Sequence, residues 1–359
     1  MQYRPLGRTG LQVSAACLGT MMWGEQNDEA FAHAQMDMSL DRGINFFDTA
    51  EMYTVPPKPE TQGNSERIIG TWFKARKNRD KVILATKIAG RSPMTWTRQG
   101  GASANDGPLD GGMTRQTRQQ IDYAVSASLK RLQTDYIDLY QLHWPDRGYA
   151  GFGFHTYRDY ADGGEWEAFE SILESLDAHV KAGRIRHIGV SNESPWGVMR
   201  FLAESERRGL PRIASIQNAF SLVNRSFETG GLAEIAMREQ VGLLAYSPLG
   251  QGYLTGKYRN GAMPEGSRKK MFQRLGRYES IGAAAAIDVY CDLAAELGLS
   301  PAALALKFVD TRPWTTSTIF GATTVEQFEA DIAAFETPWT GEMQKRVDEI
   351  HKARPNPCP

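Results

Sequence analysis

Short apolar runs alternate with segments of helical periodicity along most of the chain. Runs such as INFFDT and KVILATK are each followed by a segment whose apolar residues recur every three or four positions, such as SERIIGTWFKAR. The runs predict buried strands, and the periodic segments predict amphipathic helices. The alternation occurs eight times between CLGTM and VEQFEADIAAF, and an RTG turn before it predicts an N-terminal β-hairpin. We therefore expect one α/β domain over residues 1–359, a single (β/α)8 TIM barrel, rather than a doubly wound sheet.

Three connections are longer than the few residues typical of a loop between a strand and the next helix. They follow the third, fourth and seventh predicted strands, and are Ile88 to about Thr117, the segment DRGYAGFGFHTYRDYADGGE, and Pro248 to about Ser280. Loops after barrel strands border the active face, so these loops predict lids or pocket walls, with disordered insertions as the alternative. The second loop carries aromatic residues that favour a pocket wall, namely Tyr149, Phe152, Phe154, Tyr157 and Tyr160. The tail, about residues 352–359, is expected to be loose.

Polar residues at the ends of three predicted strands form a candidate catalytic group. Asp48 and Tyr53 lie in NFFDTAEMY, Lys87 in VILATK and His143 in LYQLHWP. A nearby ammonium lowers the pKa of a phenol from about 10 toward neutral pH, and a carboxylate keeps a buried lysine charged. His143 has the parity of a side chain that points into the barrel, where its N–H orients a carbonyl oxygen. Each residue alone has a structural alternative, such as a turn cap or a solvated strand end, but together they predict proton delivery to a carbonyl oxygen.

These runs, in this order, resemble the aldo-keto reductase family. The likeness extends from PLGRTGLQVS to FGATTVEQ, and AEMYTVPPKPETQGNSE resembles the Tas-like branch of the family in particular. The resemblance implies that Asp48, Tyr53, Lys87 and His143 form the family's tetrad. It also implies reduction of aldehydes or ketones, with NADPH bound extended across the barrel mouth.

The resemblance further implies a set of cofactor-binding residues from the nicotinamide end to the adenine end. Amide and hydroxyl side chains would bind the nicotinamide carboxamide, and a tyrosine would stack on its ring. The segment YSPLGQGYLTGKY would approach the pyrophosphate, and FGATTVEQFEAD would meet the adenine side. The implied residues are Thr20, Met21, Ser191, Asn192, Gln217, Tyr246, Ser247, Leu249, Gly250, Gly321, Thr323 and Gln327.

A basic stretch suggests which nicotinamide nucleotide is bound. Seven basic residues and one acid occur between Lys257 and Arg277. By the resemblance, Lys257 and Arg268 would bind the 2′-phosphate that distinguishes NADPH from NADH, since arginine suits a phosphate geometrically; the alternative is a solvated basic face. Where many relatives carry Glu and then Asn, this chain has Ala330 and Asp331, so Asp331 would have to accept the hydrogen bond of the adenine amino group.

The amino-acid composition limits the kinds of binding partner that we expect for this protein. Lys and Arg total 41 against 42 Asp and Glu, a net charge of −1, so no overall field attracts nucleic acid or an anionic membrane. The opening MQYRPLGRTG has no apolar signal-peptide core, and no apolar run reaches the roughly 18 residues of a membrane span, so we expect a cytoplasmic protein with a small-molecule substrate. Cys17, Cys291 and Cys358 are scattered, which predicts plain thiols and no metal site. Oligomeric state has no signal in this sequence.

The main hypothesis is therefore a cytoplasmic NADPH-dependent reductase of aldehydes or ketones. One alternative is a nicotinamide-nucleotide-sensing regulatory subunit with little turnover, because the resembled family includes channel-associated members. Another is an isomerase or lyase that uses Lys87 as a Schiff base, which would need no nicotinamide.

Overall fold

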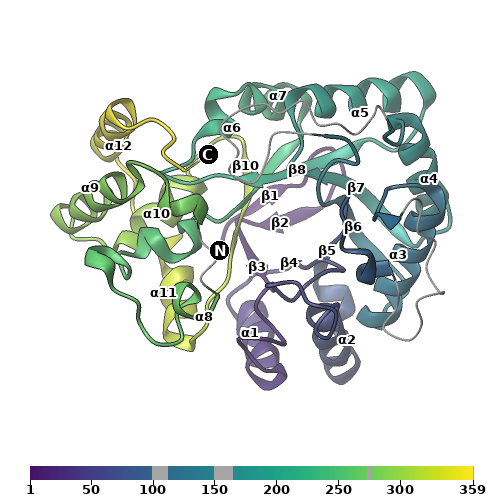
Figure 1. The fold of residues 1–359 in the computed structure, drawn as a ribbon, viewed down its shortest axis with the longest axis horizontal. Helices are drawn as coiled ribbons and strands as arrows, with labels where there is room; N and C mark the ends of the chain where they lie inside the picture. Colours follow the sequence, from purple (N-terminus) through teal and green to yellow (C-terminus); the bar gives the residue numbers. More distant parts are fainter. Residues whose placement is uncertain (99–111, 149–164, 273–275, 359) are drawn as a thin grey trace.

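Eight parallel strands close into a barrel in the computed structural model, which describes residues 1–98, 112–148, 165–272 and 276–358 (Figure 1). Each strand pairs with the next in chain order, and the last pairs with the first, so the predicted (β/α)8 barrel is confirmed and the doubly wound sheet is excluded. The strands are β3 (Ala16–Gly19), β4 (Phe46–Asp48), β5 (Ile83–Ile88), β6 (Ile137–Leu142), β7 (Ile185–Ser191), β8 (Ile213–Ala219), β9 (Gly242–Tyr246) and β10 (Thr315–Phe320).

Helices surround the barrel (Figure 1). Several begin at a side-chain cap: Asp28, Thr117, Ser194 and Ser300 each accept a hydrogen bond from a backbone N–H of the first turn. The helices after the first seven strands are α1 (Glu29–Asp41), α2 (Asn64–Arg76), α3 (Arg118–Leu132), α4 (Phe169–Lys181), α5 (Pro195–Arg208), α6 (Ser226–Thr229), α7 (Leu232–Glu239), α8 (Arg268–Phe272), α9 (Ala283–Glu296) and α10 (Pro301–Asp310). Those after the last strand are α11 (Val325–Ala334) and α12 (Gly341–Ala353).

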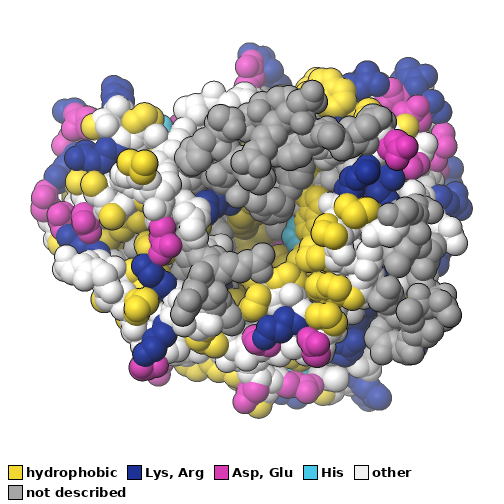
Figure 2. Space-filling model, viewed as in Figure 1, with side chains coloured by type: hydrophobic (Ala, Val, Ile, Leu, Met, Phe, Trp, Pro, Cys, Tyr) yellow, Lys and Arg dark blue, Asp and Glu magenta, His cyan; other side chains and the backbone are white. Residues whose placement is uncertain are grey.

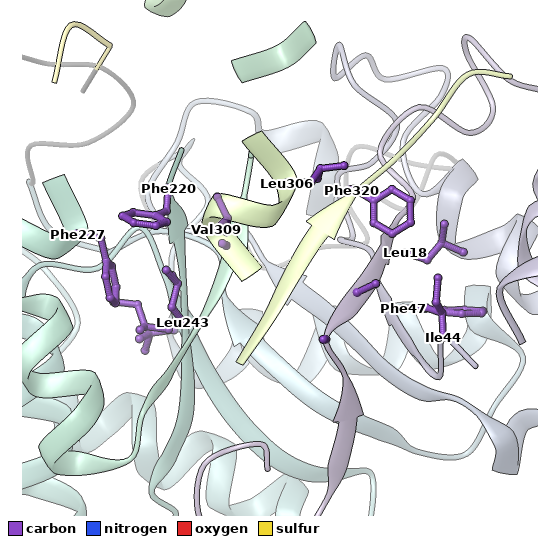
Figure 3. Close-up of a cluster of buried hydrophobic side chains, with 14 of the residues drawn as sticks. Leu18, Ile44, Phe47, Phe220, Phe227, Leu243, Leu306, Val309 and Phe320 are labelled. Carbon is purple, nitrogen blue, oxygen red and sulfur yellow. The ribbon is translucent and has the colours of Figure 1, made fainter. Parts of the chain in front are cut away.

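The main hydrophobic core fills the layer between the strands and the helices. Figure 3 shows two parts of it: Leu18, Ile44 and Phe47 lie near Phe320, and other large side chains meet across β8, β9 and α10. The second group consists of Phe220, Phe227, Leu243 and Val309. Burial of this apolar layer is what fixes the helices on the outside of the barrel.

The N-terminal hairpin closes the floor of the barrel, as its turn predicted. Strands β1 (Tyr3–Pro5) and β2 (Gln12–Ser14) pair antiparallel. Leu6 and Val13 are fully buried and belong to the interior cluster of the barrel, together with Phe46, Leu139 and Leu244. The hairpin therefore seals the end of the barrel opposite the carboxyl ends of the strands.

Residues 356–358 of the C-terminal tail are packed against the domain, although the tail was expected to be loose. Helix α12 continues to Ala353. Beyond it, the Asn356 side chain accepts a hydrogen bond from the Arg225 N–H (2.6 Å), and the Cys358 N–H donates to the Val223 carbonyl (3.1 Å). The Ser280 hydroxyl donates to the Pro357 carbonyl, and Cys358 is fully buried. The polar and proline-rich composition concealed this packing, because one small apolar cysteine supplies the buried contact.

The long connection after β9 is ordered as a series of short helical turns. It contains the 3-10 helices η4 (Gly250–Thr255), η5 (Arg259–Gly261) and η6 (Gly276–Glu279), as well as α8. The Gln26 amide donates to the Gly266 carbonyl (2.7 Å), so this connection reaches across to the loop after β3. The aromatic residues predicted to form a pocket wall, Tyr149 to Tyr160, lie outside the described residues.

Among the described residues, no single helix has the length and apolar character to cross a membrane. The bent pair α9 and α10 meets that test only when the two helices are taken together.

Candidate active site

The four predicted catalytic side chains lie together at the carboxyl ends of neighbouring strands. Asp48 ends β4, Lys87 lies in β5, and His143 directly follows β6. The Lys87 ammonium donates to Asp48 Oδ2 (2.6 Å) and to the Thr49 carbonyl (2.7 Å). The same ammonium lies 4.9 Å from the centre of the Tyr53 ring, and the Tyr53 and His143 rings meet edge to face at 5.8 Å.

Asp48 is held by two glutamine amides as well as by the lysine. Gln141 and Gln217 donate to Asp48 Oδ1 at 3.1 and 2.8 Å. The resemblance implied a nicotinamide contact for Gln217, but its amide N–H is directed to Asp48 in this structure. Gln141 was not among the predicted site residues. Its signal was present, because it has the same inward strand parity as His143.

The environment of Lys87 favours its charged form. Burial lowers the pKa of Lys87, but the Asp48 carboxylate and the Tyr53 phenol raise it, and the net pKa lies above its ordinary value. Lys87 has no exposed surface. A charged amine with hydrogen bonds to Asp48 and Thr49 has no free lone pair, which disfavours the Schiff-base alternative.

Tyr53 and His143 are both neutral near pH 7. Burial raises the pKa of Tyr53, and the opposing effect of Lys87 does not cancel it, so the expected shift toward neutral pH is wrong for this structure. That expectation weighed the ammonium without the loss of hydration around the phenol. Burial lowers the pKa of His143 well below its ordinary value, and Lys87 lowers it further. Among the described residues, His143 Nδ1 has no hydrogen-bond partner.

Apolar side chains border the tetrad on one side. Ala50, Met52, Ala89 and Trp144 form a small cluster against which Tyr53 packs. Figure 2 shows a hollow on this face of the molecule with apolar side chains and a histidine visible inside it. The mouth therefore offers a carbonyl compound an apolar wall beside polar groups.

The residues implied to border the nicotinamide surround the same mouth. The Asn192 amide donates to the His143 carbonyl (2.9 Å), and the Tyr246 hydroxyl donates to Asn192 Oδ1 (2.6 Å). The Ser191 hydroxyl donates to the Gln217 carbonyl (2.7 Å). The Thr20 hydroxyl donates to the Asp48 carbonyl (3.0 Å), and the neighbouring Met21 carbonyl accepts from the Val55 N–H (2.8 Å).

The segment implied to approach the pyrophosphate has an unusual backbone. Ser247, Gly250 and Gly252 all have positive φ, at 54°, 55° and 98°. The Tyr278 ring lies directly beneath Gly250, since a Cβ there would be 3.3 Å from two ring carbons. Leu249 is partly buried and packs against the hydrophobic core.

Salt bridges divide the basic stretch into two groups. Arg259, Lys269 and Lys270 each pair with a carboxylate: Arg259 with Asp288 and Asp292, Lys269 with Glu279, and Lys270 with Glu265. In the described part of the chain, Lys257 and Arg268 have no such partner. Burial lowers the pKa of Arg268, and Tyr258 and Tyr278 partly oppose the shift. Among the described residues, the two cations that the resemblance assigned to a phosphate therefore form no salt bridge, although burial raises the pKa of the Asp331 carboxyl group and Lys257 partly opposes that shift.

The implied adenine side lies at the start of α11. The Thr323 N–H and hydroxyl both donate to Gln327 Oε1 (3.1 and 3.0 Å). Gly321 lies against β3, where a Cβ would be 2.9 Å from the Gly19 carbonyl oxygen. Burial raises the pKa of Asp331 to about 7, against a lowering effect of Lys257.

Arg277 is a further cation of the mouth that was not singled out from the sequence. Its pKa is lowered by burial but raised by Tyr246 and Tyr278, and the net pKa lies above its ordinary value. No three His, Cys, Asp or Glu side chains of the described ranges gather in a group able to hold a metal ion.

An eight-stranded α/β barrel with Asp, Tyr, Lys and His side chains at one mouth is the architecture of a barrel oxidoreductase. The sequence model of the Aldo/keto reductase family matches residues 15–352, and the chain belongs to that family.

Relatives agree with this assignment. The chain is 44% identical over 359 residues to Protein tas of Escherichia coli strain K12, which covers the whole of both proteins and confirms the resemblance to the Tas-like branch. It is 36% identical over 352 residues to the uncharacterized oxidoreductase YrpG of Bacillus subtilis, or 98% of this chain and 96% of the relative. It is 27% identical over 344 residues to a probable voltage-gated potassium channel subunit beta of Arabidopsis thaliana, or 94% of this chain and 92% of the relative.

Proposed function

We propose that this protein is an NADPH-dependent reductase of aldehydes or ketones. The observation that carries the proposal is the buried Lys87 ammonium, held by Asp48 and placed 4.9 Å from the Tyr53 ring. A buried ion pair stabilises a fold poorly, so its position beside a phenol favours a chemical role.

The residues present fit an extended dinucleotide phosphate. The backbone turns sharply through positive φ at Ser247 and Gly250, and Lys257 and Arg268 form no salt bridge with a carboxylate among the described residues. Asn192 and Tyr246 would hold the nicotinamide, and Gly321 and Thr323 would border the adenine. When bound, the reduced nicotinamide supplies a hydride to the carbonyl carbon.

The protein's own groups then handle the charge on oxygen. Tyr53, neutral at pH 7, donates its hydroxyl proton to the carbonyl oxygen, and the product is an alcohol. Lys87 stabilises the phenolate left behind, and Asp48 keeps Lys87 charged and in place. The neutral His143 donates a ring N–H to the same oxygen and so orients the carbonyl group.

The second candidate is the nucleotide-sensing regulatory subunit. The 27% identity to the plant channel subunit over 94% of this chain is what favours it. The higher identity to oxidoreductase-type relatives supports the enzyme. For location we propose the cytoplasm, because the three free buried cysteines fit a reducing compartment.

A single-turnover experiment distinguishes the two candidates. Purified protein is mixed with stoichiometric NADPH and a panel of aldehydes and ketones, and the absorbance of the reduced nicotinamide is followed. An enzyme gives a decay with at least one substrate, and the decay is lost in Tyr53→Phe. A persistent absorbance across the panel, despite NADPH binding, would support the sensor instead.

A further inference from the structure

A second buried ion pair lies beside the tetrad and has no part in the proposed proton transfer. Glu51 lies between Asp48 and Tyr53 in the chain, and Arg98 ends the 3-10 helix η2 (Thr95–Arg98) in the connection after β5. The Arg98 guanidinium donates to Glu51 Oε1, and only 1% of Glu51 and 0% of Arg98 is exposed.

Glu51 fastens the segment that carries Tyr53 to the strand that carries Lys87. Its side chain accepts from the Ala89 N–H (2.6 Å), and its own N–H donates to the Lys87 carbonyl (3.1 Å). Arg98 also donates to the Ala89 carbonyl (3.2 Å), so Glu51 and Arg98 together hold both backbone groups of Ala89. The Gln62 amide donates to the Glu51 carbonyl (2.7 Å) and fixes the other side of the segment.

A buried ion pair of this kind contributes more to the placement of the segments it joins than to the stability of the fold. Burial of two opposite charges costs about as much as their attraction returns, so an apolar pair of similar volume would serve the fold at least as well. An apolar pair could not, however, hold the N–H and carbonyl of Ala89. The contact between Glu51 and Arg98 therefore fixes the distance between the segment that carries Tyr53 and strand β5.

We propose that Glu51 and Arg98 are positioning residues that set the placement of the Tyr53 hydroxyl relative to the Lys87 ammonium. This inference rests on the proposed reductase function. Neither residue touches the reacting groups, so their removal should slow proton delivery and leave nucleotide binding intact. Because Arg98 belongs to the connection after β5, the pair also links that connection to the proton donor.

The chain offers a matched control in the buried pair Glu66 and Arg131. Their atoms meet at 2.6 Å, Glu66 is fully buried, and its other oxygen accepts from the Thr86 hydroxyl (2.6 Å). This pair joins α2 to α3 and makes no hydrogen bond or salt bridge with residues 49–55, although the charge of Glu51 helps to raise the pKa of Arg131. Loss of one charge from either pair leaves the other charge buried, so both should destabilise the fold to a similar degree.

The test compares Glu51→Gln, Arg98→Met, the double variant and Glu66→Gln with the wild type. NADPH affinity by fluorescence, kcat and KM for an aldehyde, the pH profile of kcat and the melting temperature are measured for each. We expect Glu51→Gln and Arg98→Met to lower kcat by roughly 10- to 100-fold, as a misplacement of about 1 Å would, with NADPH affinity and KM nearly unchanged. The double variant should recover melting temperature without recovering kcat, and Glu66→Gln should lose melting temperature while keeping kcat.

Two kinetic outcomes overturn the inference. One is a kcat that follows melting temperature through all four variants, including recovery in the double variant, which is the behaviour of a purely structural pair. The other is an unchanged kcat in Glu51→Gln.

Amide hydrogen exchange of residues 49–55 provides a readout that needs no turnover. Exchange should rise in Glu51→Gln and in the double variant and stay at the wild-type level in Glu66→Gln. If the wild type itself reduces no carbonyl compound, the proposed function fails, and equal exchange in all variants would separately remove the positioning role.

Discussion

The pKa of Lys87 lies above its ordinary value, with Asp48 as the main raising influence, although the side chain has no exposed surface. The Asp48 carboxylate and the Thr49 carbonyl provide the contacts that water would otherwise give. A charge kept in a low-dielectric site acts strongly on its neighbours, and the nearest ring is the Tyr53 phenol. The chemistry proposed for the mouth depends on this one placement.

Replacement of Tyr53 by Phe tests the proton donor. The ring keeps its packing against His143, so NADPH binding should be nearly unchanged. The fall in kcat should be at least the roughly 10²- to 10⁴-fold usual for a general acid. Steady-state kinetics with an aldehyde and a fluorescence titration of NADPH measure both quantities. Wild-type kcat in the Phe variant would exclude Tyr53 as the donor, and Lys87→Met should behave in the same way as Tyr53→Phe.

Arg268 and Lys269 provide a neighbouring pair for a test of cofactor choice. Arg268 has no carboxylate partner among the described residues, whereas Lys269 pairs with Glu279 at 2.9 Å. Charge-assisted hydrogen bonds contribute about 1.5–3 kcal/mol each, so Arg268→Ala should weaken NADPH by roughly 10- to 100-fold and leave NADH almost unchanged. Lys257→Ala should act in the same direction, and Lys269→Ala should change neither nucleotide. An equal loss of NADPH and NADH affinity in Arg268→Ala would show that Arg268 does not contact the 2′-phosphate.

Asp331 should make the stability of the cofactor-free protein depend on pH. Its folded-state pKa of about 7 lies above the ordinary 3.8, so its carboxylate opposes folding above pH 7, and the penalty disappears as the pH falls to about 4. Asp331→Asn should raise the free energy of unfolding by about 2–4 kcal/mol at pH 8, with a smaller gain at pH 6 and none at pH 4. Urea unfolding at the three pH values measures this. A gain independent of pH would mean that the carboxylate is not the cause.

At the scale of elements, the tail and the connection after β9 support each other. The Ser280 hydroxyl binds the Pro357 carbonyl, and Tyr278, two residues before Ser280, lies under Gly250. Deletion of residues 355–359 should lower the free energy of unfolding by about 1–3 kcal/mol and weaken NADPH binding, because the connection loses a buried anchor. Ser280→Ala removes one hydrogen bond and should have a smaller effect in the same direction. Unaltered NADPH affinity after the deletion would contradict the proposed link between the tail and NADPH binding by the connection after β9.

The sequence predicted best those helices and strands whose apolar residues recur with a clear period. Eight strand and helix units could be read because the apolar spacing changes between them, and the ends of the strands indicated four side chains that lie close together in the structure. Helix α10 was not among the predicted elements, although Ser300 caps its first turn and Pro301 begins it. The docking of Cys358, the Gln217 contact with Asp48 and the Glu51–Arg98 pair depend on which segments meet in space. Spacing along the chain carries no signal for such contacts.

At the scale of the whole molecule, closure of the barrel is what assembles the site. Asp48, Lys87, His143, Gln217 and Tyr246 are distant in the chain, yet each lies within two residues of the carboxyl end of its own strand. Such a site forms only when all the strands pair, so site geometry and global folding are linked. The sequence could therefore indicate the correct end of the barrel but not the distances there.

This linkage predicts stabilisation of the whole fold by the nucleotide. A ligand that binds only the folded state at a hundredfold excess over its Kd adds about 2.7 kcal/mol to the free energy of unfolding. NADPH should raise the melting temperature of the wild type and of Tyr53→Phe to the same extent, since the phenol is not needed for binding. Differential scanning fluorimetry with NADPH and NADH measures the shift. An absent shift would contradict the proposed cofactor itself.

The N-terminal hairpin determines the end of the barrel by which small molecules can enter and leave. Leu6 and Val13 block the barrel floor, which leaves no passage along the axis. In the proposed reduction, substrate would therefore enter, and alcohol would leave, by the opening at the carboxyl ends of the strands, where the nucleotide is also proposed to bind. Alcohol that leaves and aldehyde that enters then compete for the same opening, so accumulated alcohol should slow the binding of aldehyde even when all four tetrad residues are present.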